Sequence, residues 1–365
     1  MQKPARPFFS SGPCVKPRTW TPQVAEHALL GRSHRSQEGM ALSKKAIQLT
    51  REVLKIPDTH KIMLTPGSAT GAIEMMFWNL LGARGTDMFS WDVFGQRWTR
   101  DLQRALKLQD LNVHSAEARH LPDLSQYDPT RDTVFNWNGT TTGVWVPDGN
   151  WIADDRDGLV LCDAASAVGT AHLPWDKLDA IAFSPQKAFG SEAAFGILVL
   201  SPKAIERLQT YQPAWPVPTL LTLQRNGKVI QPYFDGATVN TISMLALEDY
   251  LFCLEWCQDI GGIDSMVKRS RQNFAIIEQW VQETERVEFM AIAPETRASS
   301  SICLSVKDAD EAEIIRICTA LAQQKVAYDV KNHGHGPLGL RIWGGPTVDA
   351  EDIKALLPWI TAELG

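Results

Sequence analysis

The chain has 365 residues, of which 44% are hydrophobic and 21% are charged, and its net charge is −6 at pH 7. The length exceeds what one hydrophobic core usually covers, so we expect two domains, or one large domain with a lobe. The composition is typical of a soluble globular protein, and the negative charge argues against a nucleic-acid-binding protein. No stretch of about 18 residues is apolar, so we expect no transmembrane helix and no membrane partner.

The first 20 residues lack an apolar core of signal-peptide length, so we expect a cytoplasmic protein. The six cysteines are spread along the chain and none forms a Cys-x-x-Cys pair. Cys253 and Cys257 are one helical turn apart in an apolar stretch. We therefore expect buried free thiols rather than metal ligands or disulfides.

Apolar strands alternate with helices in the first part of the chain. After an irregular segment over residues 1–40, a helix is predicted with Leu42, Ala46 and Leu49 on one face. Helices are also predicted after the first two strands, the second of them reaching about Lys107. This alternation predicts an α/β domain whose largely parallel sheet is covered on both faces. The predicted strands are 61–65, 87–91, 133–138, 159–164, 180–184 and 196–201.

The second part of the chain changes character. Residues 205–240 are rich in proline and polar residues, and a long helical stretch over 242–286 follows, with a break at "IGGI". The remaining residues predict a small α+β lobe. Its predicted strands are 301–306, 326–330 and 338–343, and its predicted helices are near 310–323 and 349–363. The predicted division is an N-terminal segment (1–15) associated with the small domain and the active site, a large domain (16–260) and a small C-terminal domain (261–365).

Lys187 lies in "SPQKAFG", a tight turn at the end of an apolar strand. Most lysines are solvated surface residues. A lysine amine acts as a nucleophile only when it is unprotonated, which requires a site that lowers its pKa. Because α/β proteins bind ligands at the carboxyl ends of their strands, Lys187 is a candidate catalytic residue.

Asp163 lies in "LCDAASAVG", directly after four apolar residues. A carboxylate at the end of a buried strand needs a partner, because an unpaired buried charge is costly. Asp163 caps a turn in one interpretation and faces a cationic ring nitrogen in the other. Only one strand separates it from Lys187, so both can lie at the same edge of the sheet.

Seven motifs along the chain resemble those of the phosphoserine aminotransferases, class V members of the fold-type I pyridoxal-phosphate-dependent enzymes. The resemblance covers most of the chain, and it rests on the order of the motifs rather than on any one of them. It implies a large domain with a mostly parallel seven-stranded sheet and a small α+β C-terminal domain. The motifs are "FSSGP", "SHRS", "NGTTTG", "DAASA", "SPQKAFG", "TVNT" and "GLRIWGG".

The resemblance assigns roles around the cofactor, pyridoxal 5′-phosphate. Lys187 bonds the cofactor aldehyde and later moves a proton at the substrate Cα, and Asp163 pairs with the pyridinium nitrogen. Of the three aromatic residues in "WDVFGQRW", Phe94 is placed on the face of the ring, with core packing as the alternative. Thr140 in the polar turn "NGTTTG" is placed near Asp163.

The cofactor phosphate is assigned to the turn "TPGSATGA", which begins a helix after a strand. The expected contacts are Ser68, Ala69, Thr70 and Gln186, with Asn240 and Thr241 reaching across a dimer interface. The turn differs from the Gly-Gly-Gly-Arg version of the better-known branch, so an arginine contact found there is missing here or supplied elsewhere. A plain capped helix and a dinucleotide turn are the alternatives for "TPGSATGA", and a helix cap is the alternative for "TVNT".

Substrate recognition is assigned to basic residues. The resemblance implies that Arg341 holds the α-carboxylate through two parallel hydrogen bonds. It also implies that His34 and Arg35 of the partner subunit bind the substrate phosphate, to which His333 and His335 can add. A solvated loop is the alternative for the His-Arg pair. The "HGH" sequence lacks a third ligand nearby, so we expect no metal.

The resemblance thus implies a homodimeric aminotransferase that exchanges the amino group between L-glutamate and 3-phosphohydroxypyruvate, giving O-phospho-L-serine and 2-oxoglutarate. In this family the activity serves serine synthesis and often pyridoxine synthesis. A serine–pyruvate or alanine–glyoxylate aminotransferase is the nearest alternative, followed by a nicotinamide-dependent oxidoreductase and a module without cofactor. A cysteine desulfurase is disfavoured, because Cys303 lies within the apolar stretch "SICLSV".

Overall fold

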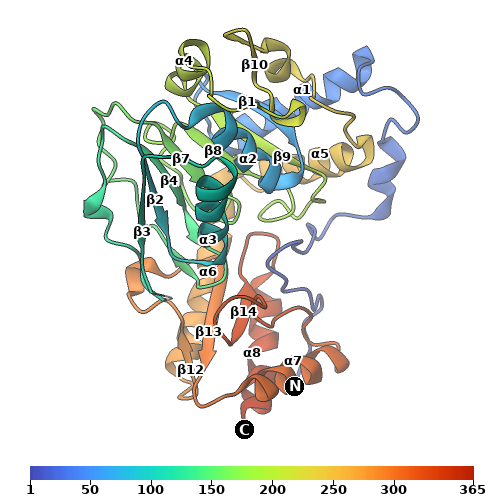
Figure 1. Cartoon of the computed structure of the whole chain (residues 1–365). Helices are drawn as coiled ribbons and strands as arrows, with labels where there is room; N and C mark the ends of the chain where they lie inside the picture. Colours follow the sequence, from blue (N-terminus) through green and yellow to red (C-terminus); the bar gives the residue numbers. More distant parts are fainter. Residues whose placement is uncertain (118) are drawn as a thin grey trace.

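The computed structural model describes residues 1–117 and 119–365. Its largest element is a seven-stranded sheet with the order β1-β9-β8-β7-β4-β2-β3 (Figure 1). The strand β9 is antiparallel to both of its neighbours, whereas the other four pairings in this sheet are parallel. The predicted largely parallel α/β sheet is confirmed. Its strands are β1 (Lys61–Pro66), β2 (Thr86–Ser90), β3 (Leu111–Ser115), β4 (Asp132–Asn136), β7 (Val160–Asp163), β8 (Ala180–Phe183) and β9 (Phe195–Leu200).

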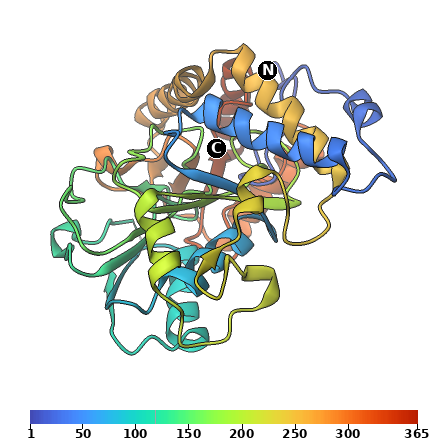
Figure 2. The same ribbon diagram turned by 90° about the horizontal axis from the view of Figure 1, so that it is seen from above.

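Both faces of this sheet are buried. Along β9, Ile197 and Val199 belong to one hydrophobic core, whereas Leu198 and Leu200 belong to the core on the opposite face. This alternation follows from the two-residue period of a strand. Figure 2 shows α1 and α5 together on one side of the sheet and α2 and α4 on the other. The helices of this part are α1 (Gln37–Leu54), α2 (Ser68–Leu80), α3 (Val93–Arg100), α4 (Pro202–Thr210), α5 (Met244–Asp259) and α6 (Gly262–Gln282).

A smaller unit follows at the C-terminal end, in the lower part of Figure 1. It contains an antiparallel sheet with the order β12-β13-β14. The predicted strand at 326–330 is wrong, because Tyr328 forms only an isolated bridge with Phe8. The predicted domain boundaries at 15/16 and 260/261 stay predictions. The elements of the unit are β12 (Val287–Phe289), β13 (Ser301–Val306), β14 (Leu340–Trp343), α7 (Glu311–Gln323) and α8 (Ala350–Leu364).

The N-terminal segment, residues 5–16, joins the two parts. The backbone N–H groups of Tyr328 and Trp343 donate to the carbonyls of Pro7 (2.9 Å) and Phe9 (3.0 Å). Further along, the N–H of Cys14 donates to the carbonyl of Gln186 at 2.8 Å. The segment therefore runs from the small unit to the turn that contains Lys187.

The remaining elements are short. The helix predicted to reach Lys107 ends as α3 at Arg100 and continues as a π-helical turn, Asp101–Ala105.

No helix among the residues described is both long and apolar enough to span a membrane. The short strands are β5 (Asn138–Gly139), β6 (Val144–Trp145), β10 (Gln224–Arg225) and β11 (Lys228–Val229), and the 3-10 helices are Pro22–His27, Leu124–Gln126, Thr219–Leu221, Gln231–Asp235 and Pro294–Thr296.

Candidate active site

The turn after β8 carries Lys187 and is fixed at both ends. Cys14 of the N-terminal segment donates its N–H to Gln186, and the Gly190 N–H donates to the Lys187 carbonyl at 3.0 Å. Beyond the turn, the Ser191 hydroxyl donates to Asp249 of α5 at 2.6 Å. These bonds hold the backbone of Lys187 in one conformation.

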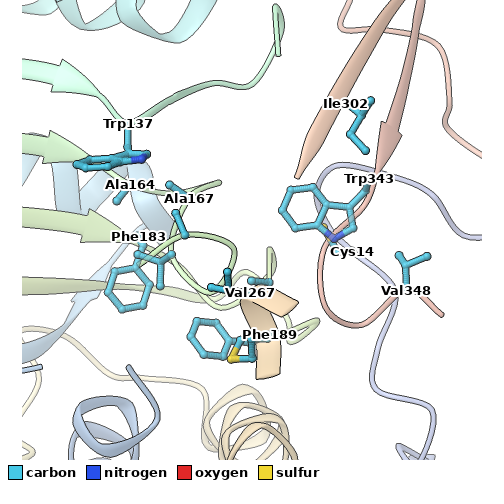
Figure 3. Close-up of a cluster of buried hydrophobic side chains, with 14 of the residues drawn as sticks. Cys14, Trp137, Ala164, Ala167, Phe183, Phe189, Val267, Ile302, Trp343 and Val348 are labelled. Carbon is cyan, nitrogen blue, oxygen red and sulfur yellow. The ribbon is translucent and has the colours of Figure 1, made fainter. Parts of the chain in front are cut away.

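The Lys187 amine lies in a partly buried space between the N-terminal segment and Trp343 of β14. Its Nζ donates to the carbonyl of Ser11 and lies 5.9 Å from the ring centroid of Trp343. Burial lowers the pKa of Lys187 below its ordinary value. A Cβ on Gly12, which has φ +136°, would lie 2.9 Å from Nζ, so a side chain there would displace the amine. Figure 3 shows Trp343 extending from β14 toward the side of Ala164 and Ala167.

Asp163 ends β7 at the same edge of the sheet and is 8% exposed. Its Oδ1 accepts from the Ala165 N–H at 3.0 Å, and its Oδ2 accepts from Trp98 Nε1 at 2.9 Å. Burial raises the pKa of the Asp163 carboxyl, whereas these two hydrogen bonds and the charge of Lys187 oppose that rise. The structure thus brings the two predicted catalytic residues within electrostatic reach of each other.

Arg341 approaches this space from β14. Its Nη1 donates weakly to the Thr140 carbonyl at 3.4 Å, and its buried Nε has no hydrogen-bond partner among the described residues. Burial lowers the pKa of Arg341. Because a buried guanidinium needs acceptors, a substrate carboxylate suits this position.

Phe94 and His333 lie next to each other. Their ring centroids are 5.8 Å apart, and Phe94 belongs to the first turn of α3. Burial lowers the pKa of His333, and the charges of Arg341, His335 and Lys187 lower it further. His333 therefore lies near Arg341 and Lys187 and is partly buried, whereas His335 is exposed.

Thr140 belongs to a buried polar cluster beside Asp163. Its hydroxyl lies 2.8 Å from the Ser166 hydroxyl. Asn138 Nδ2 donates to Ser166 at 3.0 Å and to Ser300 of the small unit at 3.1 Å. This cluster links the loop after β4 to the segment that follows Asp163.

The N-terminus of α2 lies at the same sheet edge, because β1 runs parallel to β8 on the other side of β9. Gly67 precedes the helix with φ 77° and offers no side chain to cap it. The first backbone N–H groups, at Ser68, Ala69 and Thr70, therefore remain available to an anion.

Other predicted contacts are not assembled in the single chain. Gln186 Oε1 accepts from the Ser184 hydroxyl rather than facing α2. Asn240 donates to the carbonyl of Thr241, in an exposed segment. Within the part of the chain that the structure describes, no hydrogen bond or ion pair joins His34, Arg35 or this segment to Lys187, Asp163 or Arg341. Their predicted action from a partner subunit stays a prediction.

Sequence reasoning missed two partners at the site. The first is Trp98, one of the three aromatic residues considered for stacking on the cofactor ring. It instead donates its indole N–H to Asp163. The other is Asp92, a buried carboxylate whose Oδ1 accepts from the Gly95 N–H at 2.8 Å and caps α3. The four-residue spacing from Phe94 places Trp98 one turn further along the same helix, which signals proximity but not its partner.

Cys303 is buried in β13, opposite Arg341, and burial raises the pKa of its thiol to about 12. A thiol that stays protonated and fixed in a strand is not a mobile nucleophile, so this supports the argument against a desulfurase. The described residues contain no group of three or more His, Cys, Asp or Glu side chains suited to a metal ion.

These residues fit pyridoxal phosphate. Lys187 is a partly buried amine for its aldehyde, Asp163 a buried carboxylate for its ring nitrogen, and the uncapped start of α2 suits its phosphate. Arg341, with an unpartnered buried Nε, remains for the substrate.

Comparison with known proteins also indicates an enzyme that uses pyridoxal phosphate. The profile described as "Aminotransferase class-V" matches residues 23–338. The chain belongs to the class-V aminotransferases, which depend on pyridoxal phosphate.

Within the class-V aminotransferases, the chain is similar to phosphoserine aminotransferases. A curated phosphoserine aminotransferase of Methanosarcina mazei is 44% identical over 357 residues, which cover 98% of this chain and 96% of that protein. The crystal structure of a phosphoserine aminotransferase from Cytophaga hutchinsonii superposes with a TM-score of 0.84 at 19% identity and covers 99% of each chain. That of a PLP-bound phosphoserine aminotransferase from Trichomonas vaginalis gives 0.79 at 17% identity, covering 97% of this chain and 99% of that one. The fold is therefore the fold-type I architecture expected from the motifs.

Proposed function

We propose that this protein is a phosphoserine aminotransferase that exchanges the amino group between L-glutamate and 3-phosphohydroxypyruvate. The observation that carries the proposal is the proximity of Lys187 to Asp163 and Arg341, whose charges both act on its amine, in a chain 44% identical to curated phosphoserine aminotransferases. This reaction forms phosphoserine and 2-oxoglutarate, and it serves serine synthesis.

Pyridoxal phosphate, when bound, supplies an aldehyde and a ring that accepts the electrons of the substrate Cα–H bond. The neutral Lys187 amine would remove the proton from the substrate Cα, and the ammonium so formed would hold that proton for its return. Burial favours that neutral form, because it lowers the pKa of Lys187. Asp163 would pair with the ring nitrogen, and its two hydrogen bonds and the charge of Lys187 favour the ionised carboxylate against the effect of burial.

Arg341 orients both substrates through the α-carboxylate that they share. Its buried Nε supports this role, because it has no partner among the described side chains and backbone. His34 and Arg35 are proposed to bind the distal phosphate or carboxylate from the second subunit. Asn240 and Thr241 are proposed to reach the cofactor phosphate in the same way, so that each active site is completed in a homodimer. We also propose a cytoplasmic enzyme with a further role in pyridoxine synthesis.

The cofactor assignment is tested by borohydride reduction. The purified protein should be yellow, and borohydride should bleach it and fix the cofactor on the peptide that contains Lys187, as read by mass spectrometry. Lys203→Ala is the matched control, because Lys203 is also a partly buried amine but donates to the carbonyls of Arg156 and Gly158. A colourless protein, or label on another lysine, contradicts the assignment.

The substrate assignment is tested with single turnovers of phosphoserine, serine and alanine. Phosphoserine should react at least about tenfold faster, because a bound phosphate adds charge-assisted hydrogen bonds. Arg35→Ala should remove most of this preference and leave the rate with alanine unchanged. If Arg35→Ala leaves phosphoserine turnover intact, a serine–pyruvate or alanine–glyoxylate activity is favoured instead.

A further inference from the structure

The carboxylate of Asp163 depends on a side chain from another element. Trp98, in the second turn of α3, donates its indole N–H to Asp163 Oδ2 at 2.9 Å. Trp98 is 2% exposed, so this hydrogen bond is shielded from solvent. The other oxygen, Oδ1, accepts from the N–H of Ala165, which belongs to the same strand-to-turn segment.

The indole is held in place by its own packing. Its ring meets Phe77 of α2 edge-on, with ring centroids 6.1 Å apart. The Arg97 guanidinium lies 5.1 Å from the centroid on the same helix. Trp98 also belongs to the hydrophobic core between α2 and the sheet. The indole N–H therefore has a fixed direction, and the direction is toward Asp163.

Several groups act on the charge of Asp163. Lys187, in the turn after β8, favours the ionised form, whereas burial disfavours it. Asp92, the cap of α3, is a second buried carboxylate close enough for the Asp163 charge to raise its pKa. The Cys162 thiol precedes Asp163 on β7 and is uncharged, because burial raises its pKa. Among these groups, Trp98 is the neutral donor that bonds directly to Asp163.

We propose that Trp98 is a positioning residue: its indole N–H fixes the rotamer of Asp163 and holds the carboxylate oxygen Oδ2 in place. This inference rests on the proposed function, because it assigns Asp163 to the ring nitrogen of pyridoxal phosphate. A hydrogen bond to a charged group contributes more than one between neutral groups, so its loss is measurable.

The test removes the N–H and keeps most of the aromatic surface. In Trp98→Phe, the rate at which pyridoxal phosphate leaves the full-length holoenzyme should rise about tenfold or more. The pH below which the cofactor is released should move upward by roughly one unit, because the carboxyl pKa rises when its donor is lost. The kcat should fall by a similar factor, with the KM for glutamate within about twofold.

Trp280→Phe is the matched control. Trp280 is also buried and donates its indole N–H, to Thr361 at 2.9 Å, but it lies in α6. If the effect came only from lost packing, both variants should release the cofactor in the same way. Under the proposal, only Trp98→Phe should shift the pH of cofactor release. In the Asp163→Asn background, Trp98→Phe should have little further effect on cofactor release, because the carboxylate that the indole N–H bonds is already absent.

The outcomes separate the inference from the proposed function. If the wild-type protein binds no pyridoxal phosphate, the proposed function fails. If it binds the cofactor but Trp98→Phe releases it at the wild-type rate and pH, or if the effects of Trp98→Phe and Asp163→Asn are additive, the inference is overturned. If Trp98→Phe does not fold, NMR of the Asp163→Asn variant tests the proposal instead. The Trp98 indole N–H resonance should shift in that variant, and an unchanged resonance overturns the proposal.

Discussion

Two buried carboxylates, Asp92 and Asp163, lie close together but have different partners. Asp163 has a cation nearby in Lys187, whereas Asp92 accepts from the Gly95 N–H at 2.8 Å and from Asn136 Nδ2 at 3.2 Å. Burial raises the pKa of Asp92 to about 6, and the charge of Asp163 adds to that rise. The same residue type thus has a structural role at Asp92 and, under the proposed function, a chemical role at Asp163.

The pKa of Asp92 predicts how stability depends on pH. The folded carboxyl has a pKa of about 6 and the unfolded one about 3.8, so between these values the folded state binds more protons. Stability must therefore fall as the pH rises from about 4 to about 6, by roughly 3 kcal/mol for this group, and then level off. Urea unfolding of wild type and Asp92→Asn across this range should show the wild type losing stability relative to the variant. A constant difference between the two contradicts the prediction.

Arg341 predicts a specific effect on substrate binding. Arg341→Lys keeps the charge but loses the planar pair of donors, so the KM for glutamate and for phosphoserine should both rise about tenfold. Arg316→Lys is the control, because its guanidinium bonds Glu363 at the surface. Steady-state kinetics with both substrates measure the effect, and a change in only one KM would contradict a shared carboxylate site.

At the scale of elements, α5 holds the active-site turn through Asp249. This buried carboxylate accepts from Lys16 (3.0 Å), Trp20 (2.7 Å), the Ser191 hydroxyl (2.6 Å) and the Glu192 N–H (2.8 Å). It therefore joins a helix, the chain that follows the N-terminal segment and the loop after Lys187.

Asp249→Ala should lower the free energy of unfolding by about 3 kcal/mol, because it leaves several buried donors without an acceptor. Glu255→Ala is the control on the same helix: its pair with Lys45 is half-exposed, so the loss should stay under about 1 kcal/mol. Urea unfolding compares the two, and equal losses would rule out a special role for Asp249.

At the scale of the whole molecule, the N-terminal segment connects the small unit to the large sheet. It pairs with Tyr328 and Trp343 at one end and with Gln186 at the other, and it places the Ser11 carbonyl on the Lys187 amine. The geometry at Lys187 therefore depends on residues that precede it by more than 170 positions along the chain.

Two adjacent phenylalanines test this connection. Phe9 is completely buried, so Phe9→Ala should cost about 3–5 kcal/mol and speed proteolysis of the segment. Phe8 is 50% exposed, so Phe8→Ala should cost under about 1 kcal/mol. Calorimetry and limited proteolysis measure both, and similar losses for the two variants would show that the segment is not packed as described.

Local patterns predicted much of the fold. The apolar run at 133–138 overlaps β4, and those at 159–164 and 180–184 contain β7 and β8, because a strand buried on both faces is mostly apolar. The exposed edge strand β3 and the short β12 were missed, since neither has such a run. The stretch 326–330 has the composition of a strand but finds only one bridging partner.

The sequence by itself determined the class of fold, the two residues at the sheet edge and the family, because spacing along a strand and the order of motifs are properties of the chain. Only the tertiary structure decided which groups surround those residues. The bond from Trp98 to Asp163 spans 65 positions, and that from Lys187 to Ser11 spans 176. Such contacts arise when separate elements pack together, and burial then sets the pKa of each group they enclose.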